Sequence, residues 1–128
     1  MSRINYSSGT AWELRLGYSR AVRAGNIIEV TGTVAVDERN EVVGKGNAYE
    51  QTKFILAKIR KVIEEAGGQW GDVVRTRFFV TDIAQWEAYG KAHAECFGDI
   101  RPCLTMVEVS KLIGEDFLVE VEATAILT

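Results

Sequence analysis

The stretch "NAYEQTKFILAKIRKVIEEAGGQWGDVVRTRFFVTD", residues 47–82, decides the fold class because its apolar period changes once. In its first part, inward positions recur at steps of three and four, which predicts a helix with one buried face. Asn47 and Glu50 fit a capping box at the start, and Gly67 and Gly68 end the helix. Residues 72–82 then alternate and are rich in β-branched and aromatic side chains, which predicts a strand. The inward positions of the helix are Ala48, Thr52, Ile55, Ile59, Val62 and Ala66.

Working outward from this stretch, the same two patterns recur on both sides. Asp82 fits the cap of a second helix that ends at Gly98, and its inward face carries Trp86, Tyr89, His93, Cys96 and Phe97. The expected order is β-β-(β)-α-β-α-β-β, which predicts a two-layer α+β domain: a mixed β-sheet with two helices packed on one face. Besides 72–82, the expected strands are 18–25, 26–36, a short one at 41–44, 103–109 and 117–127.

The bulk properties exclude several classes of protein. A length of 128 residues predicts a single domain, 1–128, and 47% hydrophobic with 26% charged residues is typical of a globular chain. The net charge is −3 and no basic stripe is visible, so we expect no nucleic-acid partner. No apolar run approaches the roughly 20 residues that span a bilayer, and the first ten residues hold no apolar signal core. We therefore expect no membrane association and a cytoplasmic location.

The second face of the predicted sheet has a mixed composition. Alternation places Arg75, Arg77, Glu120 and Glu122 on the face that the two helices leave open. The same face carries large apolar side chains. Paired charges among buried apolar groups are typical of a subunit interface, and this favours a homo-oligomer. The alternative is a partly solvated sheet face in a monomer. The other residues that we assign to this face are Phe79, Met106, Glu108, Leu118 and Ile126.

Few residues are candidates for chemistry. Glu120 and Glu122 lie two apart on a mostly apolar strand, so one of them could have a raised pKa and act as a general acid or base; equally, both could form ion pairs with the arginines of the neighbouring strand. Arg101 precedes the one proline, Pro102, at a strand entrance, where a side chain can reach a ligand. Two cysteines and one histidine cannot complete a closed zinc site, and no nucleotide-binding motif is present, so we expect no metal site and no nucleotide cofactor held by such a motif.

The order and spacing of four segments resemble the YjgF/Rid family, the reactive intermediate deaminases. The resemblance implies a chorismate-mutase-like α+β fold and a homotrimer with ligand clefts between neighbouring subunits. Members of its RidA branch hydrolyse small enamines and imines without a metal or organic cofactor, which implies a small-molecule metabolite as the ligand here. The segments are 17–36, 51–83, "RPCLTMVEV" at 101–109 and "LVEVEATAI" at 118–126.

The family's site residues carry over only in part. Tyr18 aligns with a cleft tyrosine, Gly32 with a glycine whose backbone faces the ligand, and Glu120 with the carboxylate that positions or activates water. The branch's clamp arginine, which holds a substrate carboxylate, is replaced by Leu104, and its cleft asparagine by Gly90. The chain therefore resembles a divergent RidA-like branch that lacks the clamp arginine.

Two functions remain open from the sequence. In the first, the protein hydrolyses an enamine or imine less acidic than RidA substrates; Glu120 orients water, and Arg101 or Arg20 supplies positive charge. In the second, a trimer binds a small metabolite or acts as a regulator without deaminating. Losing a charge-assisted clamp costs about 1.5–3 kcal/mol of substrate binding, and this loss favours a substrate other than that of RidA.

Overall fold

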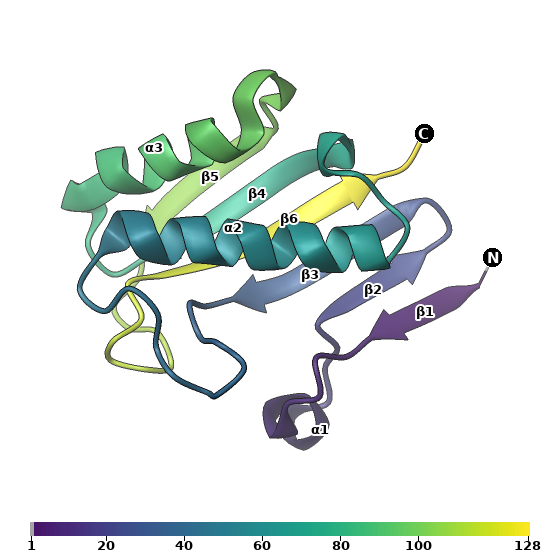
Figure 1. Ribbon diagram of the computed structural model, residues 1–128, viewed down its shortest axis with the longest axis horizontal. Coiled ribbons are helices and arrows are strands. Elements are labelled where there is room, and N and C mark those ends of the chain that lie inside the picture. Colours follow the sequence, from purple (N-terminus) through teal and green to yellow (C-terminus); the bar gives the residue numbers. More distant parts are fainter. Residues whose placement is uncertain (1) are drawn as a thin grey trace.

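The computed structural model describes residues 2–128 of the chain. These residues form a mixed six-stranded sheet in the order β1-β2-β3-β6-β4-β5 (Figure 1). The β4–β5 pair is parallel and the other neighbours are antiparallel. The strand at the centre of the open face, β6, therefore lies between β3 and β4. The strands are β1 (Arg3–Tyr6), β2 (Ala21–Ala24), β3 (Ile27–Thr33), β4 (Val73–Val80), β5 (Cys103–Glu108) and β6 (Val119–Ile126).

Two helices, α2 (Ala48–Glu65) and α3 (Trp86–Phe97), lie on one face of this sheet (Figure 1). This confirms the predicted two-layer α+β arrangement. A third, short helix, α1 (Ala11–Leu16), lies beyond the end of β1 and β2, away from the other two. Within residues 2–128, none of the helices has both the length and the apolar character that crossing a membrane requires. Three 3₁₀ turns complete the regular structure, at Trp70–Asp72, Ile83–Gln85 and Gly98–Ile100.

The core fills the space between α2, α3 and the covered face of the sheet. Ile55, Ile59 and Ile63 of α2 are fully buried, and Val119 and Val121 of β6 lie in the same apolar cluster. Each such side chain contributes about 1.5–3 kcal/mol by leaving water. The predicted face of α2 is thus confirmed.

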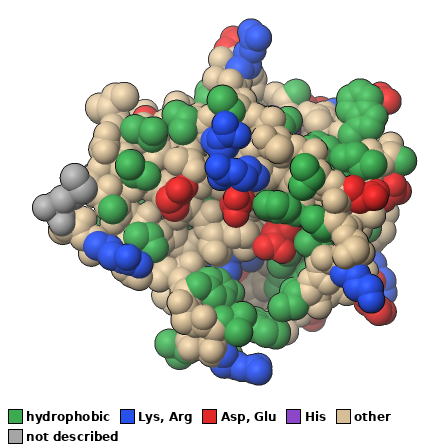
Figure 2. Space-filling view, turned by 180° about the vertical axis from the view of Figure 1, so that it is seen from behind, with side chains coloured by type: hydrophobic (Ala, Val, Ile, Leu, Met, Phe, Trp, Pro, Cys, Tyr) green, Lys and Arg blue, Asp and Glu red, His purple; other side chains and the backbone are tan. Residues whose placement is uncertain are grey.

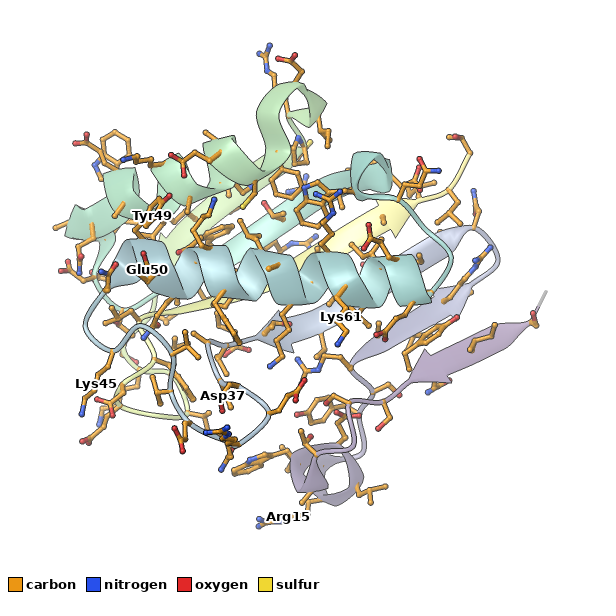
Figure 3. The ribbon with its side chains drawn as sticks, in the orientation of Figure 1. Arg15, Asp37, Lys45, Tyr49, Glu50 and Lys61 are labelled. Atoms are coloured by element: carbon orange, nitrogen blue, oxygen red, sulfur yellow. The ribbon has the colours of Figure 1, made fainter. Side chains whose placement is uncertain are left out.

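The start of α2 also follows the sequence. Asn47 caps the helix, because its side-chain oxygen accepts the backbone N–H of Glu50 at 3.0 Å. Glu50 and Lys61 lie on the outward side of the same helix and are exposed (Figure 3). The amphipathic period of residues 47–66 therefore fixes which side of α2 meets the sheet.

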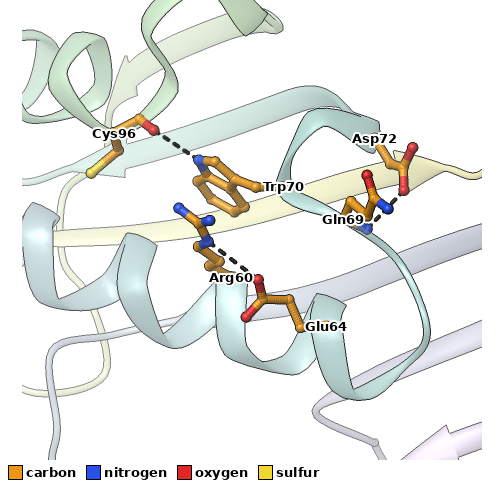
Figure 4. A network of polar contacts seen from close by, with 6 residues as sticks. All are labelled: Arg60, Glu64, Gln69, Trp70, Asp72 and Cys96. Atoms are coloured by element: carbon orange, nitrogen blue, oxygen red, sulfur yellow. Dashed lines mark hydrogen bonds and ion pairs between the residues drawn. The ribbon is translucent and has the colours of Figure 1, made fainter.

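Trp70 ties the two helices together beyond the end of α2 (Figure 4). Its indole N–H donates to the carbonyl of Cys96 on α3 at 2.8 Å, and its ring stacks on Phe97 with centroids 4.3 Å apart. The Arg60 guanidinium of α2 covers the ring at 5.9 Å from the centroid. The buried tryptophan thus has both its apolar ring and its polar N–H satisfied, as a core tryptophan requires.

The amino-terminal part of the sheet differs from the expectation. The strand predicted at 26–36 ends at Thr33, and within it the β3–β6 register shifts between Val30 and Thr33, which breaks the regular pairing. The segment 41–44 forms only an isolated bridge, Val36 to Val42. Neither β1 nor α1 was predicted: β1 is a short, mostly exposed edge strand, and the large apolar residues of α1, which are Trp12, Leu14 and Leu16, recur at steps of two and stay exposed, so both lack a helical or strand period with one buried face.

Two further assignments are corrected near β4. Asp82 caps the 3₁₀ turn at Ile83–Gln85 rather than α3, and Trp86, expected to be inward, is 58% exposed at the first residue of α3. At the start of β4, a register shift against β6 buries Val73 and exposes Val74, the reverse of simple alternation. One extra residue on a strand moves the preceding side chains to the other face.

The faces of β5 are also reversed for two residues. Met106 pairs with the buried Phe78 in the β4–β5 register, and Glu108 accepts the backbone N–H of Ile83 at 3.0 Å. Both therefore belong to the helix side, where we had placed them on the open face. Thr105 lies on the open face instead, beside Arg75, whose guanidinium donates to it at 3.4 Å. The parallel register, which the sequence does not fix, decides this assignment.

The one histidine, His93, is a core residue, as expected. It is 7% exposed on α3, its Nε2 lies 2.9 Å from the Thr76 hydroxyl, and its ring packs on Phe78 and Phe97. Burial lowers the pKa of His93 below its usual value. The neutral ring is therefore favoured in the folded state, and protonation must act against folding.

We predict that acid destabilises the protein through His93. The stability contributed by the neutral ring is fully present above the unfolded-state pKa of about 6.5, and it is lost as the pH falls below that value. Urea unfolding between pH 7.5 and 5 should show falling stability in the wild type and a shallower fall in His93→Gln. Equal slopes in the two proteins would contradict this origin of the pH dependence.

Candidate functional site

The open face of the sheet presents the carboxylate that the family resemblance singles out. Glu120 and Glu122 project from β6 to this face, because the alternate residues Val119, Val121 and Ala123 are buried under the helices. Figure 2 shows this face, with acidic and basic side chains close together among apolar patches. The predicted alternation of β6 is confirmed. Glu120 is half-buried on this face.

Gly32 makes room for the Glu120 carboxylate. Gly32 lies in the irregular part of β3 between Val30 and Thr33. A Cβ atom built on it would lie 2.0 Å from Oε2 of Glu120, far closer than a carbon atom can come. The carboxylate therefore packs against the bare Cα of this residue, and only glycine permits that position without a displacement.

Arg20 fixes the same irregularity from the other side. It directly precedes β2, and its Nη1 donates to the Gly32 carbonyl and to the Thr33 hydroxyl, both at 3.2 Å. Its guanidinium lies 5.8 Å from the centroid of the Tyr18 ring. Tyr18, Arg20, Gly32 and Glu120 are therefore linked in one place, and we call these four residues the Glu120 cluster.

One donor of Arg20 is left without a partner. Its Nε atom is buried, and within residues 2–128 nothing accepts a hydrogen bond from it. A buried donor left unsatisfied costs about 1–3 kcal/mol, and such groups are few in native proteins. This free-energy cost falls on Arg20, which lies next to Glu120, the most buried carboxylate of the open face.

Electrostatics separates the two glutamates of β6. Burial raises the pKa of Glu120 above its usual value; the nearby Arg20 acts in the opposite direction, and the charge of Glu122 raises this pKa further. Glu122 instead pairs with Arg77 of β4 at 3.3 Å. Of the two alternatives weighed from the sequence, the ion pair with a β4 arginine therefore holds for Glu122, and the raised pKa holds for Glu120.

Two neighbouring hollows surround these groups. Glu120 opens onto one of about 320 Å³ and Tyr18 onto another of about 420 Å³, and Glu122 lines both. The first hollow offers an apolar floor beside the carboxylate, together with one lysine amine. Besides the two glutamates, its lining consists of Phe79, Val109, Lys111 and Leu112.

The remaining predicted residues lie elsewhere in the chain. Leu104 is on the edge strand β5, 42% exposed, and pairs with Thr76, which places it on the helix side. Gly90 lies half-buried in α3, where a Cβ would meet no atom of the described residues within 4 Å. Arg101 is exposed in a left-handed conformation (φ 49°), and no ion pair forms to it within residues 2–128.

Within a single chain, the predicted site residues therefore lie in two separate places. The strand with Leu104 is two strands away from β6, a separation of about 9–10 Å, and Leu104 faces the opposite side of the sheet from Glu120. The structure brings Tyr18, Gly32 and Glu120 together and does not bring Gly90, Arg101 or Leu104 to them. Sequence reasoning missed the Arg20 contacts, although a glycine inside a strand pattern is a known signal of a bulge or a close approach.

The fold and this site define a class: two-layer α+β domains that present a half-buried carboxylate on an open sheet face. The family model described as "Endoribonuclease L-PSP" matches residues 9–127. The chain is 43% identical to a Mycobacterium tuberculosis member of the YjgF/YER057c/UK114 family, whose crystal structure superposes with a TM-score of 0.89 over 98% of this chain and 100% of that one. The chain belongs to the YjgF/Rid family.

Relatives of similar length support the same assignment. A RutC family protein of Pyrococcus abyssi is 36% identical over 108 residues, 84% of each chain. The 3-aminoacrylate deaminase RutC of Acinetobacter baylyi is also 36% identical over 108 residues, 84% of this chain and 85% of that protein. Because each match covers 108 of the 128 residues, it includes the two large helices, α2 and α3, and most of the strands of the sheet.

We predict that Gly32→Ala displaces the Glu120 carboxylate while the fold is kept, because the clash involves the far end of a flexible side chain. Glu120 should become more exposed, and its pKa should fall toward the ordinary value. A carbon-13 NMR titration of the glutamate carboxyls would measure this. Gly71→Ala is the matched control, since its Cβ would meet no described atom within 4 Å. An unchanged Glu120 titration in Gly32→Ala would contradict the close approach.

Proposed function

We propose that this protein hydrolyses a small enamine or imine, in a cleft between subunits of a homotrimer, with a substrate preference different from that of RidA. The observation that carries the proposal is the Glu120 carboxylate, half-buried against Gly32 with its pKa raised by burial. A carboxylate with a raised pKa can accept a proton from water near neutral pH and return it later. The deaminase name of the Acinetobacter baylyi relative supports the same reaction class.

The reaction needs only water and the substrate. Glu120 orients a water molecule and takes one of its protons, while the water oxygen bonds to the carbon of the C=N group. The C=N electron pair moves to nitrogen, and Glu120 passes its proton to that nitrogen, which gives a carbinolamine. Glu120 then takes the carbinolamine hydroxyl proton and delivers it to the nitrogen as the C–N bond breaks with its electron pair staying on nitrogen, so the carbonyl forms, ammonia leaves and Glu120 is unchanged at the end. An enamine substrate enters this sequence after a proton shift from its nitrogen to its carbon gives the imine. No redox step occurs.

The separation of the site within one chain supports a cleft shared by subunits. The cluster residues lie on the open face, whereas Gly90 and Leu104 lie on α3 and β5, on the helix side and at the far edge of the sheet. A second copy that covers the open face could bring its own β5 edge near Glu120. Exposed apolar residues on both parts, such as Ile126, Val107 and Leu104, are 38–42% exposed and favour burial by another chain.

The substrate proposal follows from what replaces the clamp. Leu104 offers no charge, and Gly90 offers no side-chain amide, so two polar groups that recognise an amino-acid-derived imine in RidA relatives are missing. We propose a substrate in which an apolar group or a weaker acceptor meets Leu104. Arg101, exposed at the entrance of β5, is the candidate for charge at the mouth of the cleft.

The second candidate is a trimer that binds a small metabolite, or regulates, without deaminating. The observation that favours it is the same pair of substitutions, Leu104 and Gly90, because binding can persist where a productive clamp is absent. An endoribonuclease activity, which the family description names, is not proposed, because the sequence shows no basic stripe that could follow a phosphate backbone.

We predict that Glu120→Gln lowers kcat for enamine hydrolysis by about 100-fold or more, the usual contribution of a general base. The acid limb of the kcat/KM profile of the wild type should lie above the ordinary glutamate pKa, because burial raises the pKa of Glu120 and the ionised form is the base. Substrates would be generated in situ, as 2- and 3-aminoacrylate and as uncharged imines. Glu64→Gln, which removes an exposed carboxylate paired with Arg60 of α2 on the helix side of the sheet, is the control that should retain activity. Full activity of Glu120→Gln would remove the proposed base, and inactivity of the wild type on all substrates would favour the binding function.

We predict that Leu104→Arg raises kcat/KM for 2-aminoacrylate more than tenfold over a weakly active wild type, because a restored clamp contributes about 1.5–3 kcal/mol. Leu14→Arg makes the same exchange at a leucine of α1 that is 90% exposed, and should have no such effect. A wild type already fully active on 2-aminoacrylate would contradict the argument from the missing clamp. Light scattering on the same samples should give three chain masses, and a monomer at micromolar concentration would contradict the shared cleft.

A further inference from the structure

The proposed base, Glu120, is held in place by backbone contacts that the sequence comparison with RidA does not explain. The Glu120 carboxylate packs on the Cα of Gly32, and Gly32 lies where the β3–β6 register shifts. A carboxylate that rests on an irregular stretch of backbone keeps its position only if that backbone keeps its shape. The regular ladder does not supply this restraint, since the register of β3 breaks between Val30 and Thr33.

Arg20 supplies the missing restraint. A single nitrogen, Nη1, donates both to the Gly32 carbonyl and to the Thr33 hydroxyl at 3.2 Å, and that hydroxyl in turn donates to the Thr31 carbonyl at 2.9 Å. Three consecutive residues of the irregular stretch are thereby joined to one guanidinium. The backbone of Arg20 is fixed as well, because its N–H donates to the Tyr6 carbonyl at 2.8 Å and its carbonyl accepts the Thr31 N–H at 3.1 Å.

Among the described residues, 2–128, no ion pair forms to the Arg20 guanidinium. Its protein acceptors are a carbonyl and a hydroxyl, both neutral, and its Nε is buried without an acceptor within residues 2–128. A guanidinium that served only to bind backbone would be expected to use its buried donors. The positive charge therefore acts on whatever carboxylate lies nearest, and Arg20 is the cation that opposes the raised pKa of Glu120.

We propose that Arg20 is the positioning residue of this site: it holds the Thr31–Thr33 backbone in the shape on which Glu120 rests, and it keeps a positive charge beside that carboxylate. The inference rests on the proposed function for its consequence in catalysis, and on the contacts alone for its effect on Glu120. It also gives a role to the tyrosine of the cluster, whose ring lies against the guanidinium and restricts it.

Other charged groups around Glu120 must be distinguished from Arg20. Glu122 on β6 raises the pKa of Glu120, but it is paired with Arg77 of β4. Lys111, after β5, lines the same hollow as Glu120. Lys58 of α2 donates to the Val36 carbonyl at 3.0 Å, and its own pKa is lowered by burial and by the charge of Arg20. Of these groups, only Arg20 also contacts the backbone of Gly32.

Two substitutions separate the two roles of Arg20. Arg20→Gln removes the charge and most of the donors, whereas Arg20→Lys keeps the charge but replaces the planar fork by a single ammonium group. Arg23→Gln is the matched control: Arg23 lies on β2, three residues on, and donates to the carbonyls of Gly25 and Ala66, away from the Glu120 cluster. Circular dichroism and urea unfolding establish that each variant is folded.

The primary measurement is the carboxyl carbon-13 titration of Glu120 in the protein without substrate. It should move to higher pH in Arg20→Gln and stay near the wild-type value in Arg20→Lys and Arg23→Gln, because only the first loses a nearby cation. An unmoved Glu120 titration in Arg20→Gln would overturn the charge role. If Arg20→Gln does not fold, Arg20→Lys remains the test of positioning.

The second measurement is kinetic. On the substrate turned over by the wild type, kcat should fall by about 10- to 100-fold in Arg20→Lys with little change in KM, the expected cost of a misplaced catalytic group. Wild-type kcat in Arg20→Lys would overturn the positioning role. The two proposals fail separately. A Glu120 titration that shifts in Arg20→Gln, together with an inactive wild type, supports the Arg20 inference and contradicts the proposed function. An active wild type with unaffected Arg20 variants supports the proposed function and contradicts the Arg20 inference.

Discussion

One-sided burial of the sheet is the constraint on which the rest of the structure depends. α2 and α3 cover one face, and the alternate residues of β6 and β4 on that face are buried almost completely; all are apolar except Thr76, whose hydroxyl pairs with His93. The residues between them carry the charges. A sheet face without its own cover can accept functional carboxylates at little cost in stability, because these groups keep contact with water until a partner or ligand arrives.

The irregularity of β3 converts this open face into a site. A regular β3–β6 ladder would place a side chain opposite each residue of β6, and Glu120 would share the surface with it. Gly32 lies in the shifted stretch between Val30 and Thr33, and because it has no Cβ, the Glu120 carboxylate packs against its Cα. The Arg20 contact to the Gly32 carbonyl lies at the same break in the pairing, and burial raises the pKa of Glu120.

Two carboxylates two residues apart illustrate how neighbours set chemical character. Glu122 meets Arg77 across the β4–β6 pair at 3.3 Å and is an exposed ion pair, which contributes about 0–1 kcal/mol and no special reactivity. Glu120 stands opposite Phe79 in the same register, so it has an apolar cross-strand neighbour and no ion pair within residues 2–128. The identity of one cross-strand residue thus separates a solvated ion pair from a candidate base.

The sequence by itself determined the α+β class, the amphipathic face of α2 with its Asn47 cap, the alternation of β6 and the core position of His93, because each follows from a local period or a local hydrogen bond. The family resemblance, which the comparisons confirm, added Tyr18 and Gly32 and selected Glu120 over Glu122. The tertiary structure alone decided the side of β5 on which Met106 and Glu108 lie, the reversal of Val73 and Val74, and the meeting of Arg20 with Gly32. These depend on strand register and on bulges, which are set by pairing between segments far apart in the chain and leave no period in the sequence.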